Sequence, residues 1–127
     1  MGIDVEYLRP IEAATLARRF FMPREYNWLT SQPVEQWQAA FFRLWTAKES
    51  VLKATGEGLA ALSHLEIGVA GDRHCSPVLR LDKPLSDQSE EWMLHSFTPS
   101  ANYVAALATA PSVVGVRYFR LLLNSLQ

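Results

Sequence analysis

The feature that most constrains the fold of this chain is a long amphipathic helical pattern that ends near Thr55. Ser31 is a plausible N-cap, with Pro33 in the first turn, and Gly56 and Gly58 supply a stop. Apolar side chains recur at core-facing spacing; they are Trp37, Phe41, Leu44, Val51 and Leu52, with Phe42 and Trp45 widening the same face. The pattern predicts a long helix whose broad apolar face must be covered by other elements.

The segments around this helix divide into helices before it and strands on either side. Residues 2–7 alternate as a strand does, and helices are predicted over residues 11–20, with Pro10 in the first turn, and over residues 24–29. Five short strands are predicted after the long helix, at 65–69, 78–81, 92–97, 103–109 and 113–119. This order indicates an α+β fold in which an antiparallel sheet packs against the long helix. No linker or repeat divides the sequence, so residues 1–127 are expected to form a single domain.

Charge and composition exclude several classes of function. Twelve basic residues against thirteen acidic ones give a net charge of −1, which argues against a nucleic-acid partner bound by bulk charge. No apolar stretch reaches the ~20 residues needed to span a bilayer, so no membrane partner is expected. The single cysteine, Cys75, cannot form an internal disulfide, and no basic-then-apolar leader opens the chain. We therefore expect a cytoplasmic protein.

Three charged residues lie on or beside the apolar face of the long helix. Lys48 falls between Leu44 and Leu52 on the apolar stripe, while Glu49 and Lys53 are four residues apart. Charges in apolar surroundings are expensive to desolvate unless they are paired or hold a charged ligand. Two alternatives remain open at this point: Glu49 and Lys53 form an ordinary surface pair, and Lys48 extends its ammonium past its neighbours into water.

Two carboxylates on the first strand bear on these alternatives. Asp4 and Glu6 share one face of residues 2–7 and lie about 6–7 Å apart along the backbone. A hard divalent cation would relieve their repulsion, and Mg²⁺ prefers a few carboxylates together with water and phosphate oxygens. Joined to Glu49 and the two lysines, the pair predicts a site for a magnesium-bound phosphate ester, although a solvent-facing acidic strand gives the same pattern.

Several of these segments occur together in one known family. They are Gly2-Ile3-Asp4-Val5-Glu6, Arg19-Phe20-Phe21 with Glu25-Tyr26, Trp45-Thr46-Ala47-Lys48-Glu49 with Lys53, and Gly56-Glu57-Gly58-Leu59. In these motifs the chain resembles the 4′-phosphopantetheinyl transferases. Because the D-x-E motif is present, it resembles the surfactin-synthetase-activating type more than the short trimeric holo-acyl-carrier-protein synthases. The resemblance implies transfer of the 4′-phosphopantetheine arm of coenzyme A to a serine of an acyl or peptidyl carrier protein, with release of adenosine 3′,5′-bisphosphate.

The resemblance also implies roles for individual residues. Asp4, Glu6 and Glu49 would ligate Mg²⁺, the implied cofactor, at the pyrophosphate of coenzyme A. Lys48 and Lys53 would bind coenzyme A, or Lys48 would help to orient the nucleophile, and Lys53 would also stabilise charge as the bond breaks. Glu49 is the candidate base for the serine proton, so Glu49 and Lys53 are the expected catalytic residues.

The other chemistry-bearing residues are expected to do less. His64, His74 and Cys75 lack the sequence partners of a metal or thiol site, and His95 is expected to be structural. Residues 22–28 are the expected carrier-docking surface. Six aromatic side chains are expected in the core; they are Phe20, Phe21, Trp28, Trp37, Phe41 and Trp92.

Two other functions stay open. One is a non-catalytic module of the same fold that binds carrier protein or coenzyme A. The other is a different magnesium-dependent phosphoryl enzyme, such as a nuclease, which the near-neutral charge and the lack of a basic stripe disfavour.

The length of the chain bears on its assembly. Relatives with the D-x-E motif usually have two similar lobes, and this chain resembles the second lobe alone. The first lobe of such relatives holds the adenine and 3′-phosphate, and the short trimeric relatives build their site between subunits. We therefore expect a homo-oligomer, a dimer or a trimer, with coenzyme A bound across an interface. The alternative is that a further lobe belongs upstream of Met1.

Overall fold

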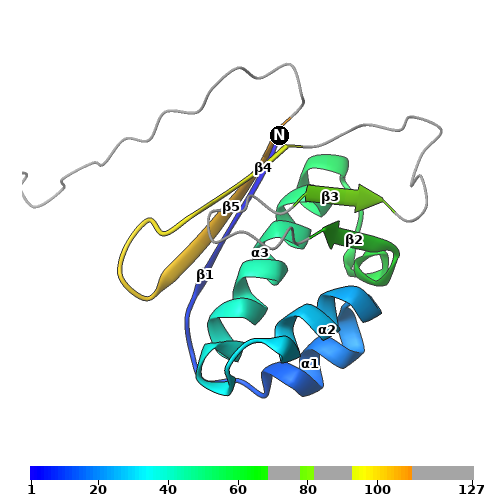
Figure 1. The fold of residues 1–127 in the computed structure, drawn as a ribbon. Coiled ribbons are helices and arrows are strands. Elements are labelled where there is room, and N and C mark those ends of the chain that lie inside the picture. The colour runs from blue at the N-terminus through cyan, green and yellow to red at the C-terminus, as the bar shows by residue number, and fades with distance from the viewer. Residues whose placement is uncertain (69–77, 82–92, 110–127) are drawn as a thin grey trace, which may run out of the picture.

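The computed structural model describes residues 1–68, 78–81 and 93–109 (Figure 1). Within these ranges strands and helices follow in an α+β order, as predicted. The elements are β1 (Gly2–Tyr7), α1 (Ala13–Phe20), α2 (Pro23–Ser31), the 3₁₀ helix η1 (Val34–Gln36), α3 (Trp37–Thr55), the 3₁₀ helix η2 (Leu59–His64), β2 (Leu65–Gly68), β3 (Val78–Leu81), β4 (Met93–Phe97) and β5 (Tyr103–Thr109).

The long helix α3 lies between two layers of structure. On one side is an antiparallel sheet in the order β1-β5-β4, in which β5 pairs with both neighbours. On the other side are α1, α2 and the two-stranded antiparallel sheet β2-β3 (Figure 1). Strand β1 therefore runs directly along α3, paired with β5 so that Asp4 lies opposite Ala106.

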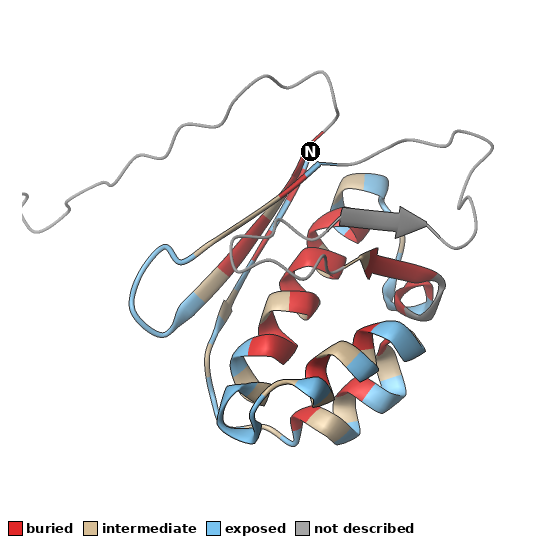
Figure 2. Cartoon of the chain, viewed as in Figure 1, coloured by how far each residue is buried: buried red, intermediate tan, exposed pale blue. Residues whose placement is uncertain are grey.

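The core forms where α3 meets both layers (Figure 2). Ala106 and Ala108 of β5 are buried against α3, and their small side chains let the helix approach the sheet closely. Trp37 and Trp45 are only partly buried and pack against the edge of the core. Each fully buried large apolar side chain contributes about 1.5–3 kcal/mol to folding; on α3 the buried ones are Phe41, Phe42, Leu44, Val51 and Leu52.

The two ends of α3 differ in how well they were predicted. Ser31 is not its N-cap: it is the last residue of α2, and its hydroxyl donates to the Trp28 carbonyl. Pro33 is the N-cap of the separate turn η1, which occupies the next three residues, and α3 begins after it at Trp37. The predicted end is confirmed, because Gly56 has a φ of 77°, a left-handed conformation that glycine adopts without strain.

The other predicted elements are largely confirmed. Helix α1 begins at Ala13, so Pro10 lies outside it, and α2 extends the predicted helix at both ends. The strands predicted at 65–69, 78–81, 92–97 and 103–109 correspond to β2–β5, whereas 113–119 lies outside the described residues. In the described ranges, no helix combines the length and apolarity that crossing a bilayer requires.

Candidate functional site

Strand β1 approaches α3 so closely that only glycine fits at position 2. A Cβ atom added to Gly2 would lie 1.9 Å from the Ser50 carbonyl oxygen and 2.6 Å from the Ala54 amide nitrogen. Real Cβ atoms essentially never come within 3.0 Å of another heavy atom in this way. The absent side chain therefore lets the strand lie on the helix backbone, and residues two and four positions further along face the helix as well.

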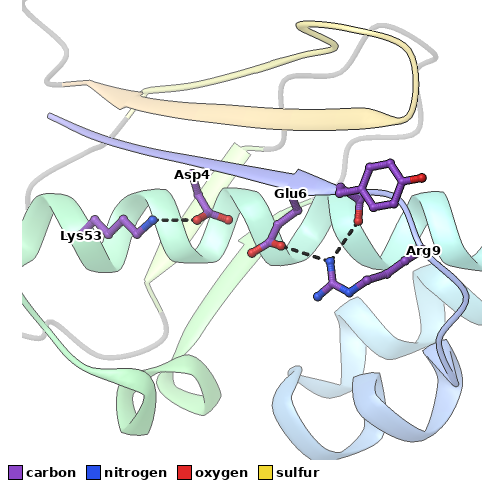
Figure 3. Close-up of polar contacts among 5 residues, drawn as sticks. Asp4, Glu6, Arg9 and Lys53 are labelled. Atoms are coloured by element: carbon purple, nitrogen blue, oxygen red, sulfur yellow. Dashed lines mark hydrogen bonds and ion pairs between the residues drawn. The ribbon is translucent and has the colours of Figure 1, made fainter.

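The face of β1 that meets α3 carries the carboxylates. Gly2 and Asp4 are buried and Glu6 is partly buried, while Ile3 and Val5 on the opposite face are exposed. Figure 3 shows the Asp4 and Glu6 side chains extending from β1 toward α3. The predicted shared face of Asp4 and Glu6 is confirmed, and the alternative of a solvent-facing acidic strand is wrong for Asp4, which is 6% exposed.

Two basic side chains contact these carboxylates. The Lys53 ammonium donates to Asp4 Oδ1 at 2.7 Å (Figure 3). The Arg9 guanidinium donates to the Tyr7 carbonyl at 3.0 Å and to Glu6 Oε2 at 3.4 Å, and it lies over the Phe42 ring. Lys53 therefore pairs with the strand, and the described residues contain no ion pair between it and Glu49.

Glu49 lies within electrostatic range of both strand carboxylates. Burial raises its pKa above the ordinary value, and repulsion from Asp4 and Glu6 raises it further, while Lys53 opposes the shift. The pKa of Lys53 is raised by its hydrogen bond to Asp4 and by all three carboxylates. The structure thus brings together four of the five predicted site residues: Asp4, Glu6, Glu49 and Lys53.

The oxygen atoms of this cluster fit a hard divalent cation. Asp4 Oδ2 and Glu49 Oε1 are buried and have no hydrogen-bond partner. No group of three or more His, Cys, Asp or Glu in the described residues converges closely enough to hold an ion by itself. Mg²⁺ commonly combines one or two carboxylates with water and phosphate oxygens. The donor set therefore fits an ion whose coordination a phosphate ligand completes.

Lys48 lies in a different environment from this cluster. Its ammonium is fully buried, donates to Glu25 Oε1 at 2.6 Å and also donates to the Leu65 carbonyl. The alternative in which Lys48 reaches water is therefore wrong. The predicted contact between Lys48 and coenzyme A finds no support in this placement, because both partners hold the ammonium inside the core.

Glu25 completes a buried network that joins three elements. Its Oε1 also accepts from the Met22 amide at 2.8 Å, where it helps to cap α2, and its Oε2 accepts from the Ile67 amide of β2 at 2.8 Å. Burial raises the pKa of Glu25 and lowers that of Lys48, and the contact between the two opposes both shifts. We call Glu25, Lys48 and their backbone partners the buried clamp.

Sequence reasoning missed Glu25 and Arg9 as parts of this region. Glu25 stands two residues after Pro23 in the first turn of a helix, a position typical of a capping carboxylate. That signal predicts the bond to the Met22 amide but not a partner on α3. Arg9 stands three residues after Glu6, between the predicted strand and the predicted helix, so nothing in the sequence indicated its contact.

The remaining predicted residues occupy the following positions. Phe21 and Phe41 are buried and their rings stack at 5.0 Å, while Phe20, Trp28 and Trp37 pack against the core, as predicted. His95 is partly buried on β4. Within residues 22–28, Glu25 is buried and Arg24 is exposed. The predictions for Trp92, His74 and Cys75 lie outside the described residues, as does the side chain of His64.

Comparisons with known proteins identify relatives of the chain. A model of the 4′-phosphopantetheinyl transferase superfamily matches residues 1–108. The chain is 46% identical over 112 residues to the 4′-phosphopantetheinyl transferase HetI of Nostoc sp., a match covering 87% of this chain and 43% of the relative. It is 31% identical over 111 residues to a Bacillus subtilis 4′-phosphopantetheinyl transferase, covering 87% and 46%. The chain spans less than half the length of these curated relatives.

Solved structures show the same fold. A holo-(acyl-carrier-protein) synthase from Bacillus anthracis, in complex with CoA (3′,5′-ADP), has a TM-score of 0.65 at 20% identity, covering 86% of this chain and 95% of that one. The acyl carrier protein synthase of Mycobacterium tuberculosis has a TM-score of 0.52 at 20% identity, covering 87% and 96%. The predicted resemblance is confirmed: the chain belongs to the 4′-phosphopantetheinyl transferase superfamily.

Proposed function

We propose that this chain transfers the 4′-phosphopantetheine arm of coenzyme A to a serine hydroxyl of an acyl or peptidyl carrier protein, with Mg²⁺ as cofactor. The observation that carries the proposal is the row of Asp4, Glu6 and Glu49 held between β1 and α3, with Lys53 beside it and two buried oxygens left without partners. The family and the relatives named as 4′-phosphopantetheinyl transferases support the choice of reaction.

The proposed reaction is an in-line displacement at phosphorus. The serine oxygen attacks the phosphorus on the pantetheine side of the pyrophosphate, and the bond to the other phosphate breaks, which releases adenosine 3′,5′-bisphosphate. Such reactions depend mainly on positioning and on neutralising charge. When bound, Mg²⁺ would neutralise pyrophosphate charge, and the residues that would hold it are Asp4, Glu6 and Glu49.

Two residues of the chain have catalytic roles in this proposal. Glu49 takes the serine proton, since its carboxylate belongs to the row and one of its oxygens has no hydrogen-bond partner. Lys53 neutralises charge that develops on the leaving pyrophosphate oxygen, since its half-exposed ammonium lies at the edge of the carboxylate row. Lys48 is left in the buried clamp and is given no contact with coenzyme A.

The first test removes one carboxylate at a time. Asp4→Asn and Glu49→Gln should each lower the rate of carrier loading, followed by mass spectrometry, at least about 100-fold, as expected for a lost group that acts on transition-state charge. Glu35→Gln is the matched control, because Glu35 is an exposed carboxylate on η1. Wild-type loading by either site variant would contradict the site. Coenzyme A binding without any loading by the wild type would favour the non-catalytic module.

We further propose that the chain acts as a homo-oligomer, each copy a single domain of residues 1–127. The support is the outer face of the β1-β5-β4 sheet, opposite α3, where large apolar side chains of the edge strands and of the start of β5 are exposed, although Ala105 in the middle of β5 is buried. Exposed apolar patches of this kind mark protein interfaces, and an identical face on a second copy is its simplest complement. We call this the outer sheet face; its exposed large side chains are Ile3, Val5, Tyr7, Met93 and Tyr103.

Two finer proposals complete this picture. Residues 22–28, with Arg24 exposed beside partly buried Met22 and Trp28, form the proposed carrier-docking surface. A cytoplasmic place of action fits an unpaired cysteine and a reaction that consumes coenzyme A.

A further inference from the structure

The Lys53 ammonium binds one of the two strand carboxylates that are proposed to hold a divalent cation. It contacts Asp4 Oδ1 at 2.7 Å, and that carboxylate is 6% exposed. The contact joins α3 to β1 across 49 residues of sequence, so it is no local helix pair (Figure 3). Lys53 pairs with Asp4 and Arg9 pairs with Glu6, and Asp4 Oδ2 and Glu49 Oε1 still have no partner.

Lys53 and Asp4 differ greatly in their freedom to move. The Lys53 side chain is 53% exposed, so its ammonium can turn into water with little change in the core. Asp4 is buried on a strand whose glycine packs against the Ser50 carbonyl, so its carboxylate stays against α3. In an exchange of partners, the lysine leaves and the carboxylate remains.

We propose that Lys53 is a stand-in cation, which holds Asp4 in the free chain and gives it up when a divalent cation binds. The proposal rests on the function proposed above and adds a second duty to Lys53. Before the exchange, the ammonium competes with the metal for Asp4. After the exchange, the same ammonium is free to contact the phosphates of coenzyme A at the edge of the site.

We expect Lys53 to weaken metal binding in the absence of coenzyme A and to strengthen it when coenzyme A is bound. Without coenzyme A, the lysine competes for Asp4 and weakens metal binding. With coenzyme A bound, the displaced ammonium gains a phosphate partner, so the lysine favours the metal-bound state. Because linkage is reciprocal, the same residue must then couple the affinities of metal and coenzyme A to each other.

The experiment is calorimetric titration of the full chain with Mn²⁺, in the absence and presence of saturating coenzyme A. Lys53→Met should bind Mn²⁺ about 3- to 10-fold more tightly than the wild type without coenzyme A. With coenzyme A it should bind Mn²⁺ at least about 3-fold more weakly than the wild type, since a charge-assisted contact is lost. Lys53→Arg, which keeps the charge, should stay close to the wild type in the first titration.

Two further variants control the result. Arg19→Met removes one positive charge from an exposed position of α1, where the guanidinium lies over the Phe20 ring. This substitution should leave Mn²⁺ affinity unchanged. Asp4→Asn should abolish the gain caused by Lys53→Met, because the competition takes place at that carboxylate.

Equal or weaker Mn²⁺ binding by Lys53→Met without coenzyme A would overturn the inference. Absence of Mn²⁺ binding by both proteins would overturn it together with the metal site. If Lys53→Met strengthens Mn²⁺ binding without coenzyme A and weakens it with coenzyme A, but the protein loads no carrier, the role of Lys53 is supported and only the proposed reaction is contradicted. The two proposals can therefore fail separately.

Discussion

Glu49 is held in a position that favours its protonated form. Its carboxylate is partly buried, one oxygen lacks a partner, and Asp4 and Glu6 repel it more than Lys53 compensates, so its pKa lies above the ordinary value. A charged group in this position lowers the stability of the folded chain. The repulsion that a cation would relieve is therefore measurable in the chain on its own.

The first residue-scale prediction is that Glu49→Gln stabilises the metal-free chain at pH 7. When folding raises the pKa of a carboxyl group, the folded chain loses stability as the pH rises through the folded-state pKa. At neutral pH the charged Glu49 therefore destabilises the wild type, whereas the uncharged glutamine of the variant does not. We expect Tm to rise by about 2–4 °C in EDTA. The gain should shrink as the pH falls and vanish well below the ordinary glutamate pKa of about 4.5, where the group is protonated in both states. Thermal unfolding across that pH range checks both parts, and a gain that does not change with pH would contradict the explanation.

At this scale, the sequence showed which residues share a face but not which face is buried. The alternation of β1 places Asp4 and Glu6 together, yet a simple hydrophobicity argument would bury Ile3 and Val5 instead. What decides the orientation is Gly2, since the side without a Cβ atom is the side that can touch the helix. That contact is tertiary, and no local pattern encodes it.

The pairing of α3 and β1 is the element-scale basis of the site. Gly2→Ala should destabilise the chain by about 1–3 kcal/mol, because the new methyl group overlaps backbone atoms of α3 that cannot move aside. Urea unfolding measures the loss. Gly58→Ala is the matched control: its φ is −88° and a Cβ there meets nothing within 4 Å, so its stability should stay within about 0.5 kcal/mol of the wild type. Equal effects of the two substitutions would contradict the close approach.

The buried clamp also connects secondary-structure elements, since its hydrogen bonds in the core join α3 to α2 and β2. Lys48→Met leaves Glu25 as an unpaired buried carboxylate and should cost about 3–5 kcal/mol. Adding Glu25→Gln should restore more than half of that loss, because the amide oxygen still accepts from backbone N–H groups and no charge is left.

A double-mutant cycle by urea unfolding checks this prediction for the clamp. Strictly additive losses would show that the two residues act independently and would contradict the ion pair. The sequence marked Lys48 as a misplaced charge but did not indicate its contact with Glu25. Its partner lies 23 residues away on a different helix, and only the packing of α2 on α3 brings the two together.

The proposed assembly of the whole molecule rests on the outer sheet face. Its exposed side chains include the Tyr7 and Tyr103 rings, which lie 5.3 Å apart on neighbouring strands. Sequence reasoning expected an oligomer from family resemblance, and the exposed apolar face supports that expectation with residues of this chain. Such a face is not evident from periodicity, because Ile3 and Val5 read equally well as core.

The molecule-scale prediction is that charge on this face weakens self-association. Val5→Lys should raise the dissociation constant of the oligomer at least about tenfold, a change of about 1.4 kcal/mol, while leaving the fold intact because the side chain is exposed. Analytical ultracentrifugation over a concentration series measures it. Val34→Lys is the control, since Val34 is equally apolar and more exposed but lies on η1. A wild type that stays monomeric at every concentration would contradict the proposed assembly and favour a further polypeptide segment as the occupant of this face.

Transfer of the coenzyme A arm by the carboxylate row and Lys53 is tested by counting both products of the same reaction. The full chain is incubated with coenzyme A, Mg²⁺ and an apo carrier protein, and a carrier with alanine in place of the acceptor serine serves as control. Intact-mass spectrometry counts loaded carrier, and chromatography counts adenosine 3′,5′-bisphosphate. We expect one nucleotide released for each arm gained, with neither product from the alanine carrier or the Glu49→Gln variant. Nucleotide release without loading, or no product at all from the wild-type chain in its oligomeric form, would contradict it.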